Sequence, residues 1–398
     1  MRRNTSITLL TLGHACVDVY QGAVASLVPY LVAERAYGYA AASGVVLAAS
    51  LLSSVAQPLF GVLTDRRAVS WLLPAGTLLA GLGIALSGTS GSYAFTLAVV
   101  AVSGTGVAAY HPESARVARL AAGDSHGAMG WFSLGGNVGF ALAPVLVAAV
   151  VGTHGLRWTP LLALPALAGA ALALTVLRSP ARRRPLGAAP AAGTDDRAAF
   201  LRLSLAVVCR SVVFTGLSSF LSLYAAQRLG GGPAAGTTAL FVLYLGGALG
   251  SVLGGVLAGR LDRVTVCRRA YLLSAVAVAG VVLVPGPALY LCVALTSVGL
   301  YVPFSLQVTL GQDYLPSRVG TAGGVTLGLS VGIGGLASPL VGRVADATSL
   351  RTALAPLVLM PLLSWLLLRT LPEPAGPGRR EDPPAGDAQR AVPKSWVQ

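Results

Sequence analysis

The chain has 398 residues, of which 55% are hydrophobic and 11% are charged, and it carries a formal net charge of +14. A water-soluble protein carries roughly 25% charged residues, so this composition excludes one. The positive charge is dispersed in small clusters between apolar runs, without a continuous basic face, and this excludes nucleic acid as a partner. The mean hydropathy of +0.73 instead indicates a polytopic membrane protein embedded in the lipid bilayer.

The first apolar segment follows Arg2 and Arg3 and runs to Cys16, where it is similar to a lipoprotein leader. Its apolar character continues to Val32. This is too long for the hydrophobic region of a signal peptide and long enough to cross a bilayer. We therefore expect an uncleaved first helix.

Further apolar runs follow, each bounded by charges, by glycine and proline clusters or by turn residues. The predicted helices span 7–32, 41–64, 71–88, 93–112, 127–152, 158–177, 200–226, 236–258, 270–286, 287–311, 321–344 and 353–371. The predicted fold class is therefore an all-α integral membrane protein with twelve transmembrane helices.

These helices divide into two halves. We expect a first six-helix bundle over 1–177, a Pro/Ala/Gly-rich cytoplasmic linker over 178–199, a second bundle over 200–371, and a disordered cytoplasmic tail over 372–398. The halves also resemble each other in sequence, since residues 139–144 parallel 334–339 and residues 61–66 parallel 255–260. Two repeated bundles around a midplane site are typical of a secondary transporter, which binds a small-molecule substrate.

The basic residues favour one orientation in the membrane. With both termini in the cytoplasm, 22 of the 28 basic residues fall on cytoplasmic segments, as the positive-inside rule requires. We expect a monomer in the cell inner (cytoplasmic) membrane.

Two charged residues lie deep within predicted helices, Asp18 in the first and Arg210 in the seventh. A charge at the bilayer centre costs about 2.5 to 3.5 kcal/mol on insertion scales, so such residues are candidates for function. We expect both to face a central cavity and to interact, with Asp18 exchanging a proton and Arg210 attracting an anionic group. A static ion pair that only joins the halves is the alternative.

Other polar residues are candidates for the same cavity. His14, Asp18 and Gln21 recur at i, i+4 and i+7, so they share one helical stripe that faces the interior or water. His14 could share the proton of Asp18, or it could be a satisfied interior histidine. The candidates for cavity lining in other helices are Gln57, Asn137 and Gln307, each of which could equally form a hydrogen bond between helices.

The run Tyr110-His111-Pro112-Glu113-Ser114 is predicted to end the fourth helix, because proline disrupts the backbone ladder. His111 and Glu113 are candidates for a second titratable station near the cytoplasmic mouth. A salt bridge from Glu113 to a nearby arginine, Arg116 or Arg119, is the alternative.

No catalytic chemistry is expected. The four cysteines lack the spacing of a disulfide framework or of metal ligands, so we predict no metal site and no cofactor. The sequence contains neither an ATP-binding loop nor a catalytic triad, so the chain is not expected to be an enzyme.

Residues 61–67, Gly-Val-Leu-Thr-Asp-Arg-Arg, resemble the loop motif G-x-L-x-D-R-x-G-R of the major facilitator superfamily. The run from Gly130 through Gly139 to Pro144 is similar to the superfamily's fifth-helix antiporter motif, which favours export. By this resemblance and by the internal repeat, a set of residues is assigned to gating: Gly61, Asp65, Arg66, Gly139, Pro144, Gly334 and Pro339.

A narrower resemblance rests on His14-x3-Asp18 and on residues 110–119, together with residues 126–127 and 135–139. These look like the fosmidomycin resistance protein group of the superfamily. The resemblance implies proton-driven efflux of small drugs, including a phosphonate whose anionic group would suit Arg210. The superfamily's fourth-helix arginine is absent near Val100, so proton coupling must use other groups. An uptake symporter for a small carboxylate or sugar, and a non-transporting sensor or scaffold, are the alternatives.

Overall fold

The computed structural model describes residues 3–122, 125–178 and 194–374, and within these ranges the chain forms helices and no strand. Helices are the expected solution in lipid, where backbone N–H and C=O groups must find their partners within the segment. Twelve membrane-spanning segments follow one another, which confirms the predicted fold class.

The first bundle contains six spans. They are α1 (Arg3–Arg35), α2 (Tyr39–Arg66), α3 (Leu72–Leu86), α4 (Tyr93–Ala122), α5 (His126–His154), and a sixth span formed by η1 (Leu156–Ala163) and α6 (Leu164–Leu177).

The second bundle repeats this order with more interruptions. Its first four spans are single helices: α7 (Arg197–Leu229), α8 (Gly232–Ala258), α9 (Arg263–Leu283) and α10 (Ala288–Tyr314). The eleventh span joins η2 (Pro316–Arg318), α11 (Val319–Gly323), the π-helical η3 (Gly324–Leu329) and α12 (Ser330–Ala347). The twelfth joins α13 (Leu350–Leu354), η4 (Ala355–Val358) and α14 (Leu359–Leu368).

Most helices are slightly longer than predicted, and two extend furthest beyond their predicted bounds, α4 at its end and α9 at its start. α4 continues through Pro112 to Ala122, so the prediction that it ends at the proline is wrong. The residues after Pro112 are polar, and hydropathy therefore ended the apolar run although the helix continues; neighbouring helices can compensate for the lost backbone bond. α9 begins at Arg263 because the Asp262 side chain caps it, accepting a hydrogen bond from Thr265 N at 2.7 Å.

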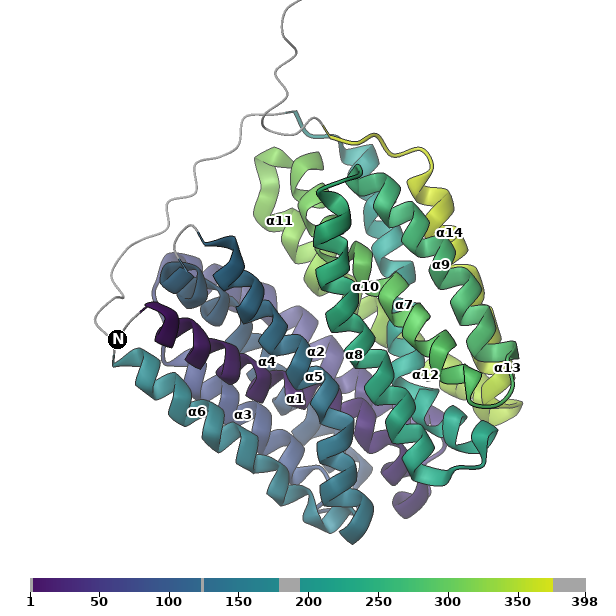
Figure 1. Cartoon of the computed structure of the whole chain (residues 1–398). Coiled ribbons are helices and arrows are strands. Elements are labelled where there is room, and N and C mark those ends of the chain that lie inside the picture. The colour runs from purple at the N-terminus through teal and green to yellow at the C-terminus, as the bar shows by residue number, and fades with distance from the viewer. Residues whose placement is uncertain (1–2, 123–124, 179–193, 375–398) are drawn as a thin grey trace, which may run out of the picture.

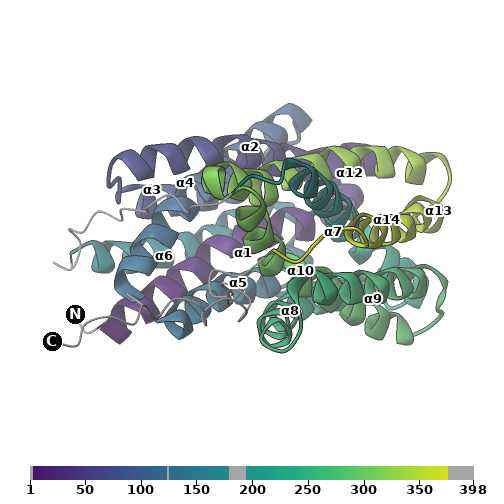
Figure 2. The same ribbon diagram turned by 90° about the horizontal axis from the view of Figure 1, so that it is seen from above.

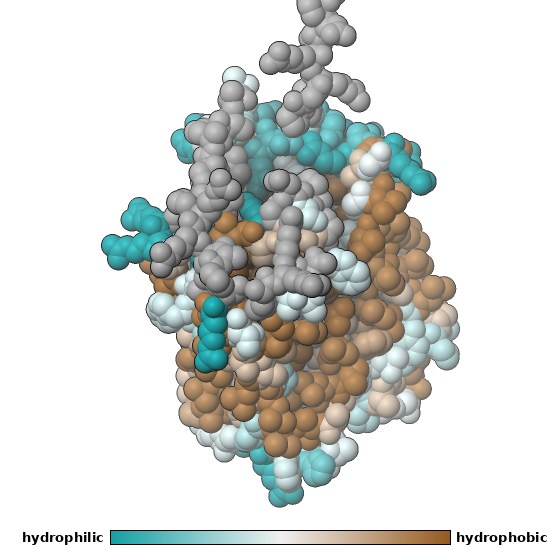
Figure 3. All heavy atoms as spheres, turned by 60° about the vertical axis from the view of Figure 1, so that its left-hand side comes forward, coloured by the Kyte–Doolittle hydropathy of each residue, from teal (hydrophilic) through white to brown (hydrophobic). Residues whose placement is uncertain are grey.

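The two bundles lie side by side (Figures 1 and 2), with α1 to α6 in one and α7 to α14 in the other. They pack against each other mainly through α2 with α12 and α5 with α8. Figure 3 shows hydrophobic atoms over the middle of one face and hydrophilic atoms above and below it, the pattern expected of a surface that lies in a bilayer.

Hydrogen bonds between the bundles gather at the end of the molecule where α1 ends and α2 begins. The carboxylate of Asp346, in the last turn of α12, accepts hydrogen bonds from Tyr39 N at 2.7 Å and Ala40 N at 3.0 Å. Gln227 of α7 donates to the Tyr39 hydroxyl at 3.1 Å. The second bundle thus caps the first turn of α2.

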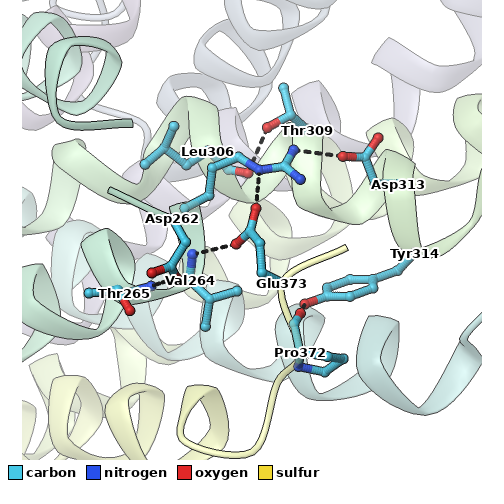
Figure 4. Close-up of polar contacts among 10 residues, drawn as sticks. Asp262, Val264, Thr265, Leu306, Thr309, Asp313, Tyr314, Pro372 and Glu373 are labelled. Atoms are coloured by element: carbon cyan, nitrogen blue, oxygen red, sulfur yellow. Dashed lines mark hydrogen bonds and ion pairs between the residues drawn. The ribbon is translucent and has the colours of Figure 1, made fainter. Parts of the chain in front are cut away.

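The segment after α14 is fixed at the opposite end of the second bundle (Figure 4), so the prediction of a disordered tail from residue 372 is wrong for its first residues. Arg263 pairs with Glu373 at 2.7 Å and with Asp313 at 2.6 Å, and Tyr314 donates to the Pro372 carbonyl at 2.6 Å. These charged residues are far apart in sequence, so the sequence alone did not predict that they meet. The rest of the predicted tail and most of the predicted linker lie outside the described residues.

Candidate functional site

A cavity of about 420 Å³ lies between the two bundles. Helices α1, α2, α4 and α5 line it from one side and α7, α8 and α10 from the other. Seven of the polar residues predicted for the site reach it: His14, Asp18, Gln21, Gln57, His111, Asn137 and Arg210.

Two histidines enclose the carboxylate of Asp18. His14 Nε2 lies 3.3 Å from Asp18 Oδ2, and His111 Nε2 lies 3.1 Å from Asp18 Oδ1. Both are ion-pair distances, although Oδ1 has no well-aligned hydrogen bond. All three residues are largely buried, with Asp18 only 8% exposed. Among the described residues this is the one His/Cys/Asp/Glu group whose spacing, within 4.8 Å, could also accommodate a metal ion.

The second ring nitrogen of each histidine, Nδ1, lies within hydrogen-bond distance of a backbone carbonyl. His14 Nδ1 lies 2.9 Å from the carbonyl oxygen of Phe132 on α5, and the two rings stack with centroids 4.3 Å apart. His111 Nδ1 lies 2.9 Å from the carbonyl oxygen of Val107, one turn earlier in α4. The rings are therefore oriented, and their Nε2 atoms face the carboxylate.

Glycines of α5 allow it to approach this cluster. A Cβ atom at Gly136 would overlap Asp18 Oδ2 and lie 2.7 Å from His14 Cε1. Cβ atoms at Gly135 and Gly139 would overlap backbone atoms of α1. Small residues permit such close contact between helices, which makes α5 a wall of the cluster.

Arg210 lies on the opposite wall, 4% exposed, without an ionic partner among the described residues. Its Nη1 donates to the Leu300 carbonyl at 3.4 Å, and its guanidinium carbon lies 4.9 Å from the centre of the Phe304 ring. Its Nε has no hydrogen-bond partner in the part of the chain that the structure describes. An unpaired donor on a buried cation favours an anionic ligand.

Asp18 and Arg210 do not form an ion pair, so the expected direct interaction between them is wrong. They line the same cavity, but the short contacts of Asp18 are to the two histidines, and Arg210 is held by a carbonyl and by aromatic rings. Each charged side chain contacts groups of its own bundle, and the cavity separates the two.

Glu113 lies outside the cavity that His111 lines, so the two do not form one titratable station, and Glu113 instead makes the salt bridge with Arg116 given as an alternative. Its buried carboxylate binds Arg116, with Nε at 2.8 Å, and accepts from the Ser70 hydroxyl at 2.6 Å. Positions 111 and 113 are two apart on a helix, so they point in different directions.

Gln307 is also outside the cavity, which corrects its assignment as a lining residue. It is 1% exposed, and its Nε2 donates to the Tyr271 hydroxyl at 2.7 Å, joining α10 to α9.

Sequence reasoning missed an aromatic and hydroxyl lining of the cavity. Apart from the histidines, the aromatic side chains are Tyr20, Phe140, Phe214, Tyr244, Tyr301 and Phe304. The hydroxyls of Ser211 and Ser218 also line it; that of Ser211 lacks a hydrogen-bond partner among the described residues, and that of Ser218 lies next to Tyr244. The sequence held a signal for this lining. Ser218 follows Arg210 by eight residues and Ser211 by seven, and residues at these spacings share a helical face.

The residues assigned to gating are spread over several places. Arg66 is exposed and a Cβ at Gly61 would meet no described atom within 4 Å, while the Asp65 side chain lies outside what the structure describes. A Cβ at Gly334 would lie 2.7 Å from Ser211 backbone atoms, so α12 crosses α7 closely there. Pro144 and Pro339 lie within α5 and α12.

The sequence profile of the Major Facilitator Superfamily matches residues 10–339. The chain therefore belongs to this superfamily of membrane transporters, which are not enzymes.

Two curated relatives are similar along most of their length. The fosmidomycin resistance protein of Escherichia coli (strain K12) is 30% identical over 374 residues, 90% of this chain and 91% of the relative. The uncharacterized MFS-type transporter YfnC of Bacillus subtilis (strain 168) is 29% identical over 380 residues, again 90% and 91% of the two chains.

Solved structures show the same fold at low identity. The nucleoside transporter NupG has a TM-score of 0.76 at 12% identity, covering 92% of this chain and 99% of its own. A bacterial homologue of the lysosomal transporter Spinster, inward-facing and unoccupied, has a TM-score of 0.74 at 16% identity, covering 93% and 97%.

Proposed function

We propose that the chain is a proton-coupled antiporter that exports a small, anionic, phosphonate-like compound by alternating access. The observation that carries the proposal is a single cavity with a titratable His14–Asp18–His111 cluster on one wall and the unpaired Arg210 on the other. A proton site and an anion site that share one water-accessible space can each influence occupation of the other.

The ligand class follows from the lining. A phosphonate offers several anionic oxygens, which the Arg210 guanidinium and the hydroxyls of Ser211 and Ser218 can bind. The aromatic side chains around Arg210 can cover an apolar part of the same molecule. The similarity to a fosmidomycin resistance protein supports the same class.

The proposed orientation is compatible with export. With both termini cytoplasmic, as the arginine distribution favours, the α2–α12 contacts around Asp346 lie on the outer side. The bundles are then joined outside the cell, which corresponds to a state that receives its substrate from the cytoplasm.

Inverted membrane vesicles containing the protein test the proposal with radiolabelled fosmidomycin. An acidic vesicle interior should drive accumulation, and dissipating the proton gradient should stop it. Vesicles that contain the Arg210→Gln variant provide the control for substrate recognition.

Two outcomes would contradict the proposal. Gradient-driven uptake into right-side-out vesicles would make the chain a symporter. A complete absence of gradient-linked flux for fosmidomycin and for other phosphonates would remove both the coupling and the substrate class. In intact cells, overexpression should raise resistance to fosmidomycin.

A further inference from the structure

The hydrogen bonds at the Nδ1 atoms of His14 and His111 fix where the protons of both rings lie. A backbone carbonyl oxygen can only accept a hydrogen bond. The Phe132 and Val107 carbonyls each lie 2.9 Å from an Nδ1 atom, so both Nδ1 atoms must carry hydrogen. In a neutral imidazole the other nitrogen, Nε2, would then present a bare lone pair.

Both Nε2 atoms face carboxylate oxygens of Asp18, at 3.3 Å and 3.1 Å. An ionised carboxylate is an acceptor only, so with neutral histidines each contact would bring two lone pairs together. Burial makes such a repulsion more costly than in water, because the surrounding dielectric is low. Each contact is favourable only when it contains a proton.

Other polar groups around the cluster do not supply these protons. The Tyr110 ring lies near that of His14, with centroids 6.1 Å apart, and the Ser133 and Asn137 side chains lie on the cavity wall formed by α5. Cys16 is on α1 itself. From the second bundle, Arg210 of α7 and Tyr301 of α10 face the same cavity, but neither is within ion-pair distance of Asp18.

We infer that the His14–Asp18–His111 cluster is a two-proton site, occupied by two exchangeable protons in this conformation and emptied of both during transport. This rests on the proposed proton coupling and adds its stoichiometry. In the occupied state, both histidines are imidazolium and Asp18 is a carboxylate, so the cluster has a net charge of +1. In the empty state, both Nε2 protons have passed to water and the net charge is −1.

The change of sign gives the site a way to act on its surroundings. The occupied cluster is a compact cation and adds to the positive charge of Arg210 on the opposite wall. The empty cluster contains three facing acceptors, so the histidines must separate from Asp18 or take up protons again. Because His111 belongs to α4 and His14 to α1, separation moves these helices relative to each other.

Nitrogen NMR of the purified full-length protein in lipid nanodiscs, with ¹⁵N-labelled histidine and an affinity tag free of histidine, tests this directly. The shifts of the two ring nitrogens distinguish imidazolium from each neutral tautomer. The variants His14→Gln and His111→Gln assign the two signals. We expect both rings to give the imidazolium signature at neutral pH.

Asp18→Asn is the decisive variant, because it keeps the shape of the side chain and removes the charge that stabilises both imidazolium ions. We expect both rings to become neutral, with Nδ1 still protonated and Nε2 bare. His154→Gln, outside the cluster, is the matched control and should leave both signals unchanged. Size-exclusion profiles and thermal unfolding check that each variant is folded.

A single imidazolium, or two neutral rings, in the wild-type protein would overturn the two-proton inference. So would doubly protonated rings that Asp18→Asn leaves unchanged, or ring signals that shift when a chelator is added, which would indicate a bound metal in place of protons. None of these readings needs a substrate.

Transport supplies the second measurement. In proteoliposomes clamped at zero membrane potential, the substrate gradient at which net fosmidomycin flux stops should vary as the square of the proton gradient, and as its first power in His111→Gln. A first-power dependence in the wild type overturns the inference while leaving proton coupling intact. Absence of gradient-linked flux despite two imidazolium signals would instead contradict the proposed function.

Discussion

The two walls of the cavity solve the problem of a buried charge in different ways. Asp18 on α1 is surrounded by two histidines, whose charge can change near neutral pH. Arg210, on the corresponding first helix of the second bundle, is surrounded by a carbonyl and aromatic rings, whose charge cannot change. The arginine itself stays protonated at any physiological pH. The comparison teaches that the repeated bundles place different groups at their walls: titratable side chains on one and a permanent cation on the other.

Removing the charge of Asp18 should have the largest effect on transport. Asp18→Asn takes away the only carboxylate that contacts the two histidines in the described cavity. We expect gradient-driven fosmidomycin flux in vesicles to fall by at least about tenfold and to lose its pH dependence, while substrate exchange without a gradient continues. Unchanged pH-dependent flux would show that the first-bundle wall is not the proton site.

Removing the charge of Arg210 should weaken binding without uncoupling protons. Arg210→Gln leaves a neutral donor against Phe304 and Leu300, and loss of a charge-assisted contact of about 1.5 to 3 kcal/mol should raise KM for fosmidomycin by about tenfold or more. Arg210→Lys, which keeps the charge but not the planar fork, should recover part of the affinity. Equal KM values in wild type and Arg210→Gln would remove the anion site from the second-bundle wall.

A methyl group at Gly136 should disturb only the first-bundle wall. Gly136→Ala places Cβ against Asp18 and His14, and such overpacking costs about 1 to 3 kcal/mol of stability. We expect a lower unfolding temperature and a shifted pH profile of transport. Gly130→Ala, on the same helix, is the matched control: its Cβ would meet no described atom within 4 Å, so it should neither lower the unfolding temperature nor shift the pH profile.

Glu113 provides the smallest effect on transport and the sharpest control for the proton site. Its carboxylate is buried and paired with Arg116, so Glu113→Gln should lower the free energy of unfolding by about 1 to 3 kcal/mol. Thermal unfolding measures this loss. The pH profile of transport should keep its shape, and a change comparable to that of Asp18→Asn would contradict our separation of Glu113 from the cluster.

Hydropathy and insertion cost predicted the fold and the depth of Asp18 and Arg210 because both depend on the solvent around a single helix. The stripe of His14, Asp18 and Gln21 was likewise a property of one helix. What could not be predicted was which helices meet. The contact of His111 with Asp18 joins α4 to α1, and the contact of Glu113 with Ser70 depends on where α4 passes the α2–α3 connection. His111 and Glu113 were therefore assigned to one station because they are close in sequence, although they contact different helices and loops.

Asp346 contributes to the balance between the two conformations that alternating access requires. Its carboxylate, from the second bundle, occupies the place of an N-cap for α2 in the first. Capping of this kind is worth about 0.5 to 2 kcal/mol. In the proposed alternating-access cycle, α2 would give up its cap when the bundles part at this end, which would disfavour the parted conformation by roughly two- to thirtyfold from this contact alone. The fraction of molecules in each conformation would thus depend in part on the first turn of α2, whose N–H groups have the Asp346 carboxylate as a partner only while the two bundles are in contact.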